Sequence, residues 1–569
     1  MTALFTPMAI GGVTLRNRIV MPSMTTRLAD REGQVTDATV AYFRARAAGG
    51  TGLITVEMAS PERAGRHRAR ELGIYDDRFL PGLTRLVSEI HACGAKASIQ
   101  LGHAGGHTRE DVCGEPPIAP SAVPHYVYEV TGRTITPLEM SHERIARTTD
   151  AFVAAAKRAR AAGFDCVELH AAHGYLFSQF LCPAENRRQD EYGGSLANRA
   201  RIGLDTLRRI KAELPGFPVI FRLSVDDFFP TGLHFAEGFL VAKWAAEAGA
   251  DAIHVSAGHY RSLPTAHRMI PPMEYPDGVF LDYAARIKAE VAVPIIAVGR
   301  LGNPAIAMAA VDTGKADFVA LGRALIADPE WVNKVERNVP VRRCLACNKC
   351  IDEMRGGDSL TCLVNPTAGR EPEFAAGTIA RKGERIGVIG AGPAGLSYAS
   401  LVAQGNHVTV FEWESVPGGA FRHAGQAPQF QEVEARQESL TAYVDELERA
   451  CVQDGVTFEY GVDVAKFAEV LRDYERIVIA TGARYRFGCG PIIYWLLEHQ
   501  WGKSQLMRRL FSSPRLRNWF YYRARKPTGA RYGALARSGQ KISIIGDAAQ
   551  AGKGKEAIAS AFRAAYFAE

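Results

Sequence analysis

Eight short apolar runs, each ending in a polar residue or a glycine, recur along the first part of the chain. They lie near residues 18, 52, 96, 166, 218, 252, 294 and 318. Helical patterns such as "ERIARTTDAFVAAAKRARAAG" and "HFAEGFLVAKWAAEAG" separate them. Strands that alternate with helices in this way predict an α/β fold that starts with a (β/α)8 TIM barrel. At 569 residues the chain is too long for a barrel alone, so we expect further domains.

The carboxyl ends of these runs are where such a barrel places its chemistry. The residues there are Thr25, Glu57, Gln100, His170, Arg222, Gly258, Arg300 and Arg323. The last two runs end in the pairs Gly299-Arg300 and Gly322-Arg323. Backbone amides beside a guanidinium suit a phosphate dianion. A tight turn followed by a surface arginine is the other interpretation of each pair.

The run "VELHAAHGYLFSQFLCPAENRRQDEYGGSLANR" spans residues 167–199, and "LFTPMAIGGVTLRNRIVMPSM", "QLGHAG" and "APSAVP" occur elsewhere in the barrel region. Together these motifs resemble the old yellow enzyme family of FMN-dependent oxidoreductases. The resemblance implies that FMN is held at the strand ends. Pro22, Met24 and Thr25 would line the isoalloxazine, Gln100 and Arg222 would bind its pyrimidine side, and Gly299, Arg300, Gly322 and Arg323 would hold the phosphate.

His170, His173 and Tyr175 form the candidate catalytic set. On the fourth strand and the loop after it, the two histidines are close enough to converge on one ligand oxygen. Imidazole hydrogen bonds to a carbonyl polarise a conjugated C=C. Hydride from FMN would then reach the β-carbon, while Tyr175 donates a proton to the α-carbon. Two structural histidines in a loop are the alternative.

The sixth run ends in "SAGHYRSLP", so we expect His259, Tyr260 and Arg261 to line the substrate pocket. Arg261 either attracts a carboxylate or phosphate, or faces solvent. Amine dehydrogenases of this kind cage a cationic amine in aromatic rings, whereas Met58 and Met354 stand at the matching positions here. Because cation–π binding needs a ring face, these methionines disfavour small tertiary amines.

Four of the ten cysteines lie close together in "CLACNKCIDEMRGGDSLTC". Three closely spaced cysteines and a distant fourth are typical of an iron-sulfur site, whereas zinc sites usually combine two pairs. A structural zinc or free thiols stay open as alternatives. The segment follows the eighth barrel unit, as in the larger members of the superfamily, 2,4-dienoyl-CoA reductase and trimethylamine dehydrogenase. That resemblance implies a 4Fe-4S cluster held by Cys344, Cys347, Cys350 and Cys362.

A dinucleotide-binding fingerprint follows the cysteines. The stretch "RIGVIGAGPAGLSYASLVAQGNHVTVFEWES" predicts a strand, a glycine-rich turn, a helix and a second strand that ends in an acid. The fingerprint residues are Gly390, Gly392, Gly395 and Glu412. With "VIATGA" and "ISIIGDAAQ" it resembles the FAD domain of flavin disulfide reductases, in which Asp547 would reach the FAD ribityl or pyrophosphate region. Whole FAD or ADP alone could occupy it.

Relatives of the dienoyl-CoA reductase type carry an NAD(P)H-binding unit that is missing here. No second glycine fingerprint lies between Gly482 and Gly546. Residues 484–540 instead hold twelve Lys or Arg and one acid, Glu498, interleaved with aromatic residues, in a chain of net charge +7. This basic segment is a solvated cap, a docking site for an acidic electron-transfer protein, or an interfacial contact with anionic lipid. We expect no nucleic acid partner.

Five regions follow from these motifs. They are the FMN-binding barrel (1–338), the 4Fe-4S segment and linker (339–383), the first part of the FAD or ADP domain (384–483), the basic insert (484–540), and the C-terminal part of the FAD domain (541–569). Without a signal peptide or an apolar span, we expect a cytoplasmic protein, with peripheral contact at the inner membrane face as an option. By analogy with the family, we expect a homo-oligomer.

The leading functional hypothesis is reduction of a C=C conjugated to a carbonyl in an enoate, enone or enoyl-CoA. Electrons would pass from FAD through the 4Fe-4S cluster to FMN, one at a time across the cluster. The alternative is a dehydrogenase that passes electrons from an organic substrate through FMN and the cluster to a protein acceptor or a membrane pool. The missing NAD(P)H unit motivates this second hypothesis.

Overall fold

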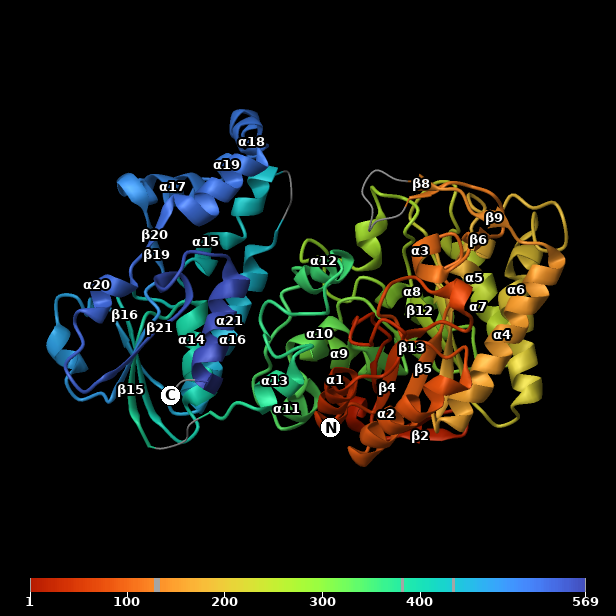
Figure 1. Ribbon diagram of the computed structural model, residues 1–569, viewed down its shortest axis with the longest axis horizontal. Helices are drawn as coiled ribbons and strands as arrows, with labels where there is room; N and C mark the ends of the chain where they lie inside the picture. Colours follow the sequence, from red (N-terminus) through yellow and green to blue (C-terminus); the bar gives the residue numbers. More distant parts are fainter. Residues whose placement is uncertain (1, 127–133, 380–382, 432–434, 568–569) are drawn as a thin grey trace. The chain divides into compact units, whose positions relative to one another are not determined.

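The computed structural model describes residues 2–126, 134–379, 383–431 and 435–567, which form two compact units (Figure 1). The first, here called the barrel unit, comprises Met1–Glu336 and Asn348–Thr361. The second, the C-terminal unit, comprises Arg337–Cys347 and Cys362–Glu569. Each unit has its own sheet and its own apolar core, as expected for a chain of this length.

Eight parallel strands close into a barrel, which confirms the predicted fold class. Their bounds match the eight apolar runs: β3 (Ile19–Met21), β4 (Leu53–Ala59), β5 (Lys96–Leu101), β10 (Cys166–Ala171), β11 (Val219–Ser224), β12 (Ala252–Ser256), β13 (Ile295–Ala297) and β14 (Phe318–Ala320). The register sets His170 beside Arg222 and Arg222 beside His254 on neighbouring strands. It also sets Gln100 beside Glu168. Polar residues far apart in sequence therefore share one end of the barrel.

A short antiparallel hairpin, β1 (Met8–Ile10) and β2 (Val13–Leu15), packs against the barrel core. Ile10 and Leu15 are buried in one cluster with strand residues such as Val20, Ile220 and Phe318. Gly11, at the turn, has a φ of +55°, a conformation that side-chain-bearing residues rarely adopt. The hairpin thus contributes apolar side chains to the barrel interior.

Helices follow the strands, as the periodic patterns predict. They are α1 (Asp37–Ala48), α2 (Leu80–Ala92), α4 (His142–Ala161), α6 (Leu196–Glu213), α7 (Phe235–Glu247), α8 (Leu281–Lys288), α9 (Pro304–Asp312), α10 (Arg323–Ala327) and α11 (Trp331–Glu336). Ser141 and Ser195 cap α4 and α6: their hydroxyl oxygens accept the backbone N–H of Arg144 and Asn198, respectively. Caps of this type fix where each helix starts, and therefore how long each loop at the barrel mouth is.

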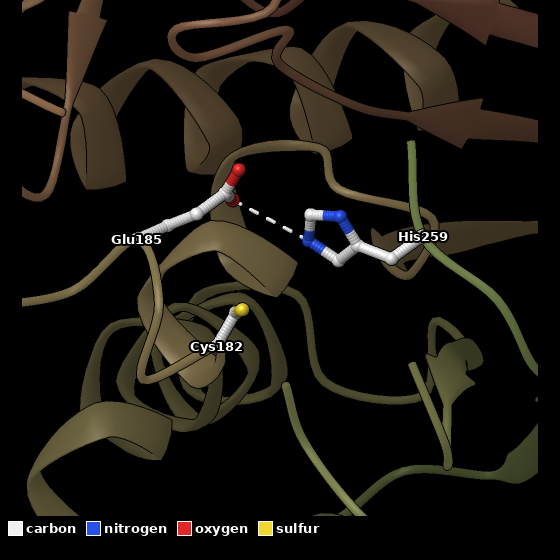
Figure 2. Close-up of side chains that lie close together, drawn as sticks. All are labelled: Cys182, Glu185 and His259. Atoms are coloured by element: carbon white, nitrogen blue, oxygen red, sulfur yellow. Dashed lines mark ion pairs between the residues drawn. The ribbon is translucent and has the colours of Figure 1, made fainter. Parts of the chain in front are cut away.

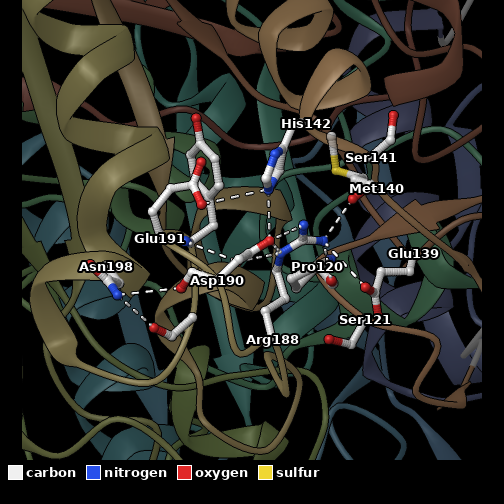
Figure 3. A network of polar contacts seen from close by, with 12 residues as sticks. Pro120, Ser121, Glu139, Met140, Ser141, His142, Arg188, Asp190, Glu191 and Asn198 are labelled. Atoms are coloured by element: carbon white, nitrogen blue, oxygen red, sulfur yellow. Dashed lines mark hydrogen bonds and ion pairs between the residues drawn. The ribbon is translucent and has the colours of Figure 1, made fainter.

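Several short elements interrupt the barrel pattern at its loops. They are α3 (Glu110–Cys113), β6 (Ile118–Ala119), β7 (His125–Tyr126), β8 (Thr134–Ile135), β9 (Leu138–Glu139) and α5 (Leu176–Leu181). Figure 3 shows how Arg188 joins the residues that follow β6 and β9. Its guanidinium donates to Pro120 O at 3.1 Å and Met140 O at 2.6 Å, and pairs with Asp190. Asp190 in turn lies 2.8 Å from His142 Nε2. Much of the motif that carries the family resemblance is therefore loop scaffolding.

The cysteine segment contributes to both units. Helix α12 (Lys349–Arg355) belongs to the barrel unit. After it, Leu360 N donates to Thr26 O at 2.8 Å. Arg68 also lies against the end of α12, with its guanidinium 2.8 Å from Met354 Sδ. These contacts fix residues 348–361 against the loops after β3 and β4. The C-terminal unit takes up the chain again with α13 (Glu371–Ala375).

The C-terminal unit contains a five-stranded parallel sheet in the order β17-β16-β15-β18-β21. Its main elements are β15 (Arg385–Ile389), α14 (Pro393–Val402), β16 (His407–Glu412), α16 (Gln437–Gln453), β17 (Thr457–Tyr460), β18 (Arg476–Ile479), β21 (Lys541–Ile544) and α21 (Gly554–Phe567). A Cβ at Gly395 would collide with the carbonyl oxygen of Gly390. The strand, glycine turn and helix have the Rossmann-like arrangement that the fingerprint predicts.

Between β18 and β21 the basic segment forms a hairpin, β19 (Ala483–Tyr485) and β20 (Arg525–Pro527), that brackets short helices. These are α17 (Gly490–Glu498), α18 (Gln505–Phe511) and α19 (Pro514–Asn518), with α20 (Gly529–Gly533) after the hairpin. In Figure 1, α17, α18 and α19 gather at one end of the C-terminal unit. Among the described residues, no helix is long and apolar enough to cross a membrane.

Candidate active site

Buried polar side chains at the ends of the barrel strands form a continuous chain. Ser23 Oγ donates to Gln100 Oε1 at 3.0 Å, and Gln100 Nε2 donates to Glu168 Oε1 at 2.7 Å. Glu168 Oε2 accepts from His254 Nδ1 at 2.7 Å, and Arg222 lies 3.8 Å from Glu168 Oε1. Burial opposes the charge of Glu168, but His254 and Arg222 outweigh it and lower its pKa to about 2. Glu168 is therefore an anion that orients both Gln100 and Arg222.

The residues expected to surround FMN lie together and fit a flavin. A Cβ at Gly322 would lie 2.8 Å from Met24 Sδ and 3.4 Å from Pro22 Cγ, so these three residues adjoin each other. Thr25 follows them and is half-buried. Arg222 Nε is buried and has no hydrogen-bond partner among the residues that the structure describes. A buried donor without a partner is costly, and flavin carbonyl oxygens would satisfy it.

The two Gly-Arg pairs have different surroundings. Gly299 has a φ of +115° and Arg300 a φ of +55°, so the backbone turns sharply there. The Arg300 guanidinium pairs with Asp277 at 2.8 Å and donates to Pro272 O at 3.0 Å. Arg323 donates to the side-chain oxygen of Asn348. Both guanidinium groups already have partners in the barrel unit, which the sequence did not indicate.

His170, His173 and Tyr175 do lie together. The His170 ring centroid is 5.2 Å from that of His173 and 4.6 Å from that of Tyr175. His170 Nδ1 is buried without a hydrogen-bond partner among the described residues, whereas His173 Nε2 lies 2.7 Å from Ser256 Oγ. Burial and then the charge of Arg222 lower the pKa of both histidines well below 6.5. Both rings are therefore neutral near pH 7, and His173 has only Nδ1 left for a ligand.

His67 is the site residue that sequence reasoning missed. Its Nδ1 lies 2.8 Å from the Tyr175 hydroxyl and also accepts from Arg68 Nε at 3.3 Å. Because Nδ1 faces an arginine donor, it carries no proton, and the tyrosine donates its O–H to it. Burial, followed by Arg68, lowers the pKa of His67 well below 6.5. His67 thus orients the hydroxyl of Tyr175 as a neutral acceptor.

Tyr260 lies beside Tyr175, with ring centroids 6.0 Å apart, and stacks on His107 at 4.7 Å. Met58 and Met269 complete a small buried cluster with the two tyrosines. Burial, and then the neighbouring Tyr260, raises the pKa of Tyr175 well above 10. Tyr175 therefore keeps its proton at physiological pH, as a general acid must.

The other two residues of the expected substrate pocket, His259 (Figure 2) and Arg261, both lie close to Glu185. His259 Nε2 lies 3.4 Å from Glu185 Oε2, and Arg261 NH1 lies 3.4 Å from Glu185 Oε1. Although burial opposes its charge, the nearby His259 and His125 lower the pKa of Glu185 to about 2. The charge of Arg261 is therefore compensated by a buried carboxylate.

Cys182, Glu185 and His259 are close enough to resemble a metal site (Figure 2). However, His259 Nδ1 accepts the Arg261 backbone N–H at 3.0 Å, so the proton of a neutral ring is on Nε2. A metal bound at Nε2 would need that proton on Nδ1, where it would oppose the Arg261 donor. Burial also raises the pKa of Cys182 well above 9, which disfavours the thiolate. The three residues therefore fit a support for the loop, held by the ion pairs of Glu185 with His259 and Arg261, better than a metal site.

The four cysteines of the iron-sulfur motif differ in environment. Cys350 is buried in the barrel unit, while Cys344 and Cys362 are half-buried and Cys347 is exposed in the C-terminal unit. Ala346 N lies 3.4 Å from Cys344 Sγ, and Ala346 has a φ of +49°. Backbone N–H groups that point at sulfur are usual around iron-sulfur clusters.

The nucleotide fingerprint of the C-terminal unit has one feature that the sequence did not predict. Glu412 Oε2 accepts from Ala391 N at 2.7 Å, next to the glycine turn. Asp547, however, pairs with Arg525 of the basic segment at 2.6 Å and accepts from Gly552 N at 3.0 Å. The basic segment is thus fastened to the residue expected to reach FAD.

The barrel, its buried polar mouth and the Tyr175 cluster define an FMN-dependent oxidoreductase. Residues 3–342 match the model of the NADH:flavin oxidoreductase / NADH oxidase family, and residues 388–435 match an NAD(P)-binding Rossmann-like domain. The chain belongs to this family, also called the old yellow enzyme family, and carries an additional C-terminal Rossmann-like domain.

Relatives extend this likeness beyond the barrel. The chain is 38% identical over 494 residues to an NADH oxidase of Thermoanaerobacter brockii, covering 84% of this chain and 73% of the relative. It is 32% identical over 521 residues to a cinnamate reductase of Clostridium sporogenes, covering 85% and 74%. A solved 2-naphthoyl-CoA reductase shares the fold over 99% of both chains, with a TM-score of 0.86 at 23% identity.

Proposed function

We propose that this enzyme reduces a C=C bond conjugated to a carboxylate or another carbonyl, as in an enoate, enone or enoyl-CoA. The observation that carries the proposal is the Tyr175 hydroxyl held 2.8 Å from neutral His67, beside a buried His170 nitrogen without a described partner. FMN, when bound, supplies the two-electron reduction. Pro22, Met24, Thr25, Gln100, Arg222 and the two Gly-Arg pairs are the residues that would hold it.

The two histidines act on the substrate carbonyl. A neutral imidazole can donate one N–H; His170, whose Nδ1 has no described partner, and His173, whose Nε2 lies beside Ser256 Oγ, each have a ring nitrogen for this. Hydrogen bonds to the carbonyl oxygen draw charge from the double bond and stabilise the enolate-like charge that develops. Tyr175, which stays protonated, delivers its proton to the α-carbon. All three side chains are buried, so little water competes for these bonds.

Local charge favours an anionic substrate. Arg27, Arg68 and Arg355 are close enough to His67 to contribute to lowering its pKa. The nearby carboxyls offset them only partly: burial raises the pKa of Glu57 to about 7 and that of Glu71 to about 8. A carboxylate is attracted by such surroundings, whereas a cationic amine is repelled. We therefore favour an enoate over an amine.

The cofactor relay is part of the proposal. Cys344, Cys347, Cys350 and Cys362 would ligate a 4Fe-4S cluster, and the C-terminal unit would bind FAD, or ADP in its place. Electrons would pass from FAD through the cluster to FMN. Purified holoprotein should then contain about four iron and four sulfide per chain. Cys350→Ser should lose the iron, whereas Cys182→Ala, a matched buried cysteine outside the motif, should keep it.

The second candidate function is a dehydrogenase, in which electrons flow in the opposite direction, from the organic substrate to an acceptor. Short helices and a hairpin, rather than a second glycine fingerprint, lie between β18 and β21. This arrangement supports a dehydrogenase that delivers electrons to a protein acceptor or a membrane pool. Anaerobic titration separates the two directions. If the enzyme is a reductase, cinnamate should reoxidise the previously reduced enzyme. If it is a dehydrogenase, its organic substrate should reduce the oxidised enzyme.

Tyr175→Phe tests the proposal. We expect the turnover of cinnamate, cyclohexenone and an enoyl-CoA by pre-reduced enzyme to fall by about 10²- to 10⁴-fold, because the general acid is lost. Tyr75→Phe, a partly buried tyrosine on another loop, should retain full turnover. Equal turnover by Tyr175→Phe and wild type on every acceptor would exclude the proposed role.

A further inference from the structure

The helices of the basic segment carry large apolar side chains and expose them. None of the residues of α17, α18 or α19 is buried, although α17 reads "GPIIYWLLE". Leu506 is 76% exposed, Ile492 62% and Trp495 48%. Soluble domains rarely leave such a concentration of large apolar side chains in water without a binding role. We call the exposed residues Ile492, Trp495, Trp501, Leu506, Leu510 and Trp519 the insert face.

The apolar residues are spaced to share helix faces. Ile492 and Trp495 are three apart on α17, and Leu506 and Leu510 are four apart on α18. The rings of Trp495 and Trp501 lie 6.0 Å apart, which joins α17 to the turn that follows it. The exposed apolar side chains of the insert face therefore come from several short helices and from the turn that joins α17 to α18.

Positive charge surrounds this cluster. Residues 499–523 contain six Lys or Arg and no Asp or Glu. Arg517 donates to Phe511 O and Ser512 O at 2.8 Å and so closes the end of α18. Lys503, Arg509, Arg515 and Arg523 are exposed. These cations are close in sequence to Trp501, Leu506, Leu510 and Trp519, whereas α17 itself carries no Lys or Arg.

We propose that the insert face docks on an anionic lipid bilayer surface. Tryptophan and leucine at the boundary between headgroups and acyl chains, with arginine at the phosphates, are the pattern of interfacial helices. A second copy of the chain would bring two such basic surfaces together, and their like charges would repel. The centre of a protein–protein interface is usually depleted of charge, whereas here cations are interleaved with the aromatic rings.

The insert face is firmly attached to the nucleotide-binding domain. The β19–β20 hairpin carries it, and Arg525 on β20 pairs with Asp547 and donates to Gly552 O. Thr528, just after β20, hydrogen-bonds Thr481 at 2.7 Å. Docking would therefore hold the C-terminal unit at the lipid surface, whichever reaction the barrel performs.

Vesicle co-sedimentation of the full-length holoprotein tests this proposal. We expect binding to vesicles with 30% phosphatidylglycerol, and at least tenfold weaker binding to pure phosphatidylcholine or at high salt. Arg509→Gln/Arg515→Gln/Arg523→Gln and Trp495→Ser/Leu506→Ser/Leu510→Ser should each weaken binding tenfold or more. A control of equal charge change, Arg160→Gln/Arg208→Gln/Lys315→Gln on exposed barrel residues, should bind like wild type.

Three results would overturn the proposal. The first is that the wild type does not bind anionic vesicles, and the second is that both insert variants bind them as well as the wild type does. The third is that the insert face instead mediates self-association or binds an acidic electron-transfer protein. Sedimentation velocity with and without an acidic ferredoxin detects the last of these. Enone turnover by both variants should equal that of the wild type, so a failed vesicle assay and a failed proposed function are distinguishable.

Discussion

Charged side chains are buried and paired at the mouth of the barrel, whereas those near the insert face are exposed to solvent. At the barrel mouth, Glu168 is fully buried between His254, Gln100 and Arg222, and the histidines nearby are neutral. On the insert face, tryptophan and leucine side chains are exposed to solvent, and exposed cations are close to them in sequence. Buried, paired charges hold their side chains in fixed positions, as a catalytic site requires. Exposed charges and apolar side chains remain accessible to a binding partner. Substitutions in the two regions should therefore have very different costs.

Glu168→Gln should have the largest effect. The substitution leaves Arg222 and His254 without their buried anion, and loss of one partner of a buried pair costs about 3–5 kcal/mol. Urea unfolding followed by fluorescence measures the loss, and FMN content should fall with it. Glu213→Gln on the surface of α6 is the control and should cost far less, because solvent screens its ion pairs. If both variants lost the same free energy of unfolding, the buried ion pairs of Glu168 would not contribute more to stability than a surface carboxylate does.

His67→Ala should slow the reaction without unfolding the barrel. Without its acceptor the Tyr175 hydroxyl is no longer oriented, so we expect kcat to fall by about 10- to 100-fold with little change in KM. His67→Gln keeps an acceptor oxygen and should restore part of kcat. A purely packing role predicts instead that the Gln and Ala variants lose the same activity.

Glu71→Gln should change how stability depends on pH. Burial raises the pKa of Glu71 from 4.5 to about 8 in the folded protein. The folded state therefore keeps a proton that the unfolded chain has lost between these values, and stability falls as pH rises from about 5 to 8, by at most about 1.4 kcal/mol per unit. The variant should show a shallower fall in barrel Tm over this range. Parallel wild-type and variant curves would contradict the assignment.

Leu506→Ser should have the smallest effect on stability. Because the side chain is 76% exposed on the insert face, the free energy of unfolding should change by less than about 0.5 kcal/mol. Leu169→Ser, inside a barrel strand, is the opposing case and should cost several kcal/mol. A large loss for Leu506→Ser would mean that the insert face packs against another part of the protein.

Local patterns predicted the fold well, because each barrel strand is a short apolar run and the nucleotide turn is a contiguous motif. The register of the strands then brings Gln100, Glu168 and Arg222 together, as expected for residues at strand ends. Contacts between distant loops could not be predicted in this way. His67 and Tyr175 are 108 residues apart and meet only because two loops converge.

Charge pairing was the other property that the sequence concealed. Arg300 was expected at the FMN phosphate, and Arg261 was expected either to attract an anion or to face solvent. In the structure they pair with Asp277 and Glu185 of the protein itself. Asp547, which is predicted to reach FAD, also pairs with Arg525. An arginine in a sequence motif favours an anionic partner. Only the three-dimensional structure shows whether a carboxylate of the protein, such as Asp277 or Glu185, already provides that partner.

Single-turnover reduction of cinnamate in D2O tests the central claim most directly. Pre-reduced wild-type enzyme should be reoxidised by cinnamate and place deuterium on the α-carbon of the saturated product. Tyr175→Phe should be reoxidised about 10²-fold or more slowly, because its proton donor is absent. Failure of every enoate, enone and enoyl-CoA to reoxidise the reduced wild-type enzyme would contradict the account.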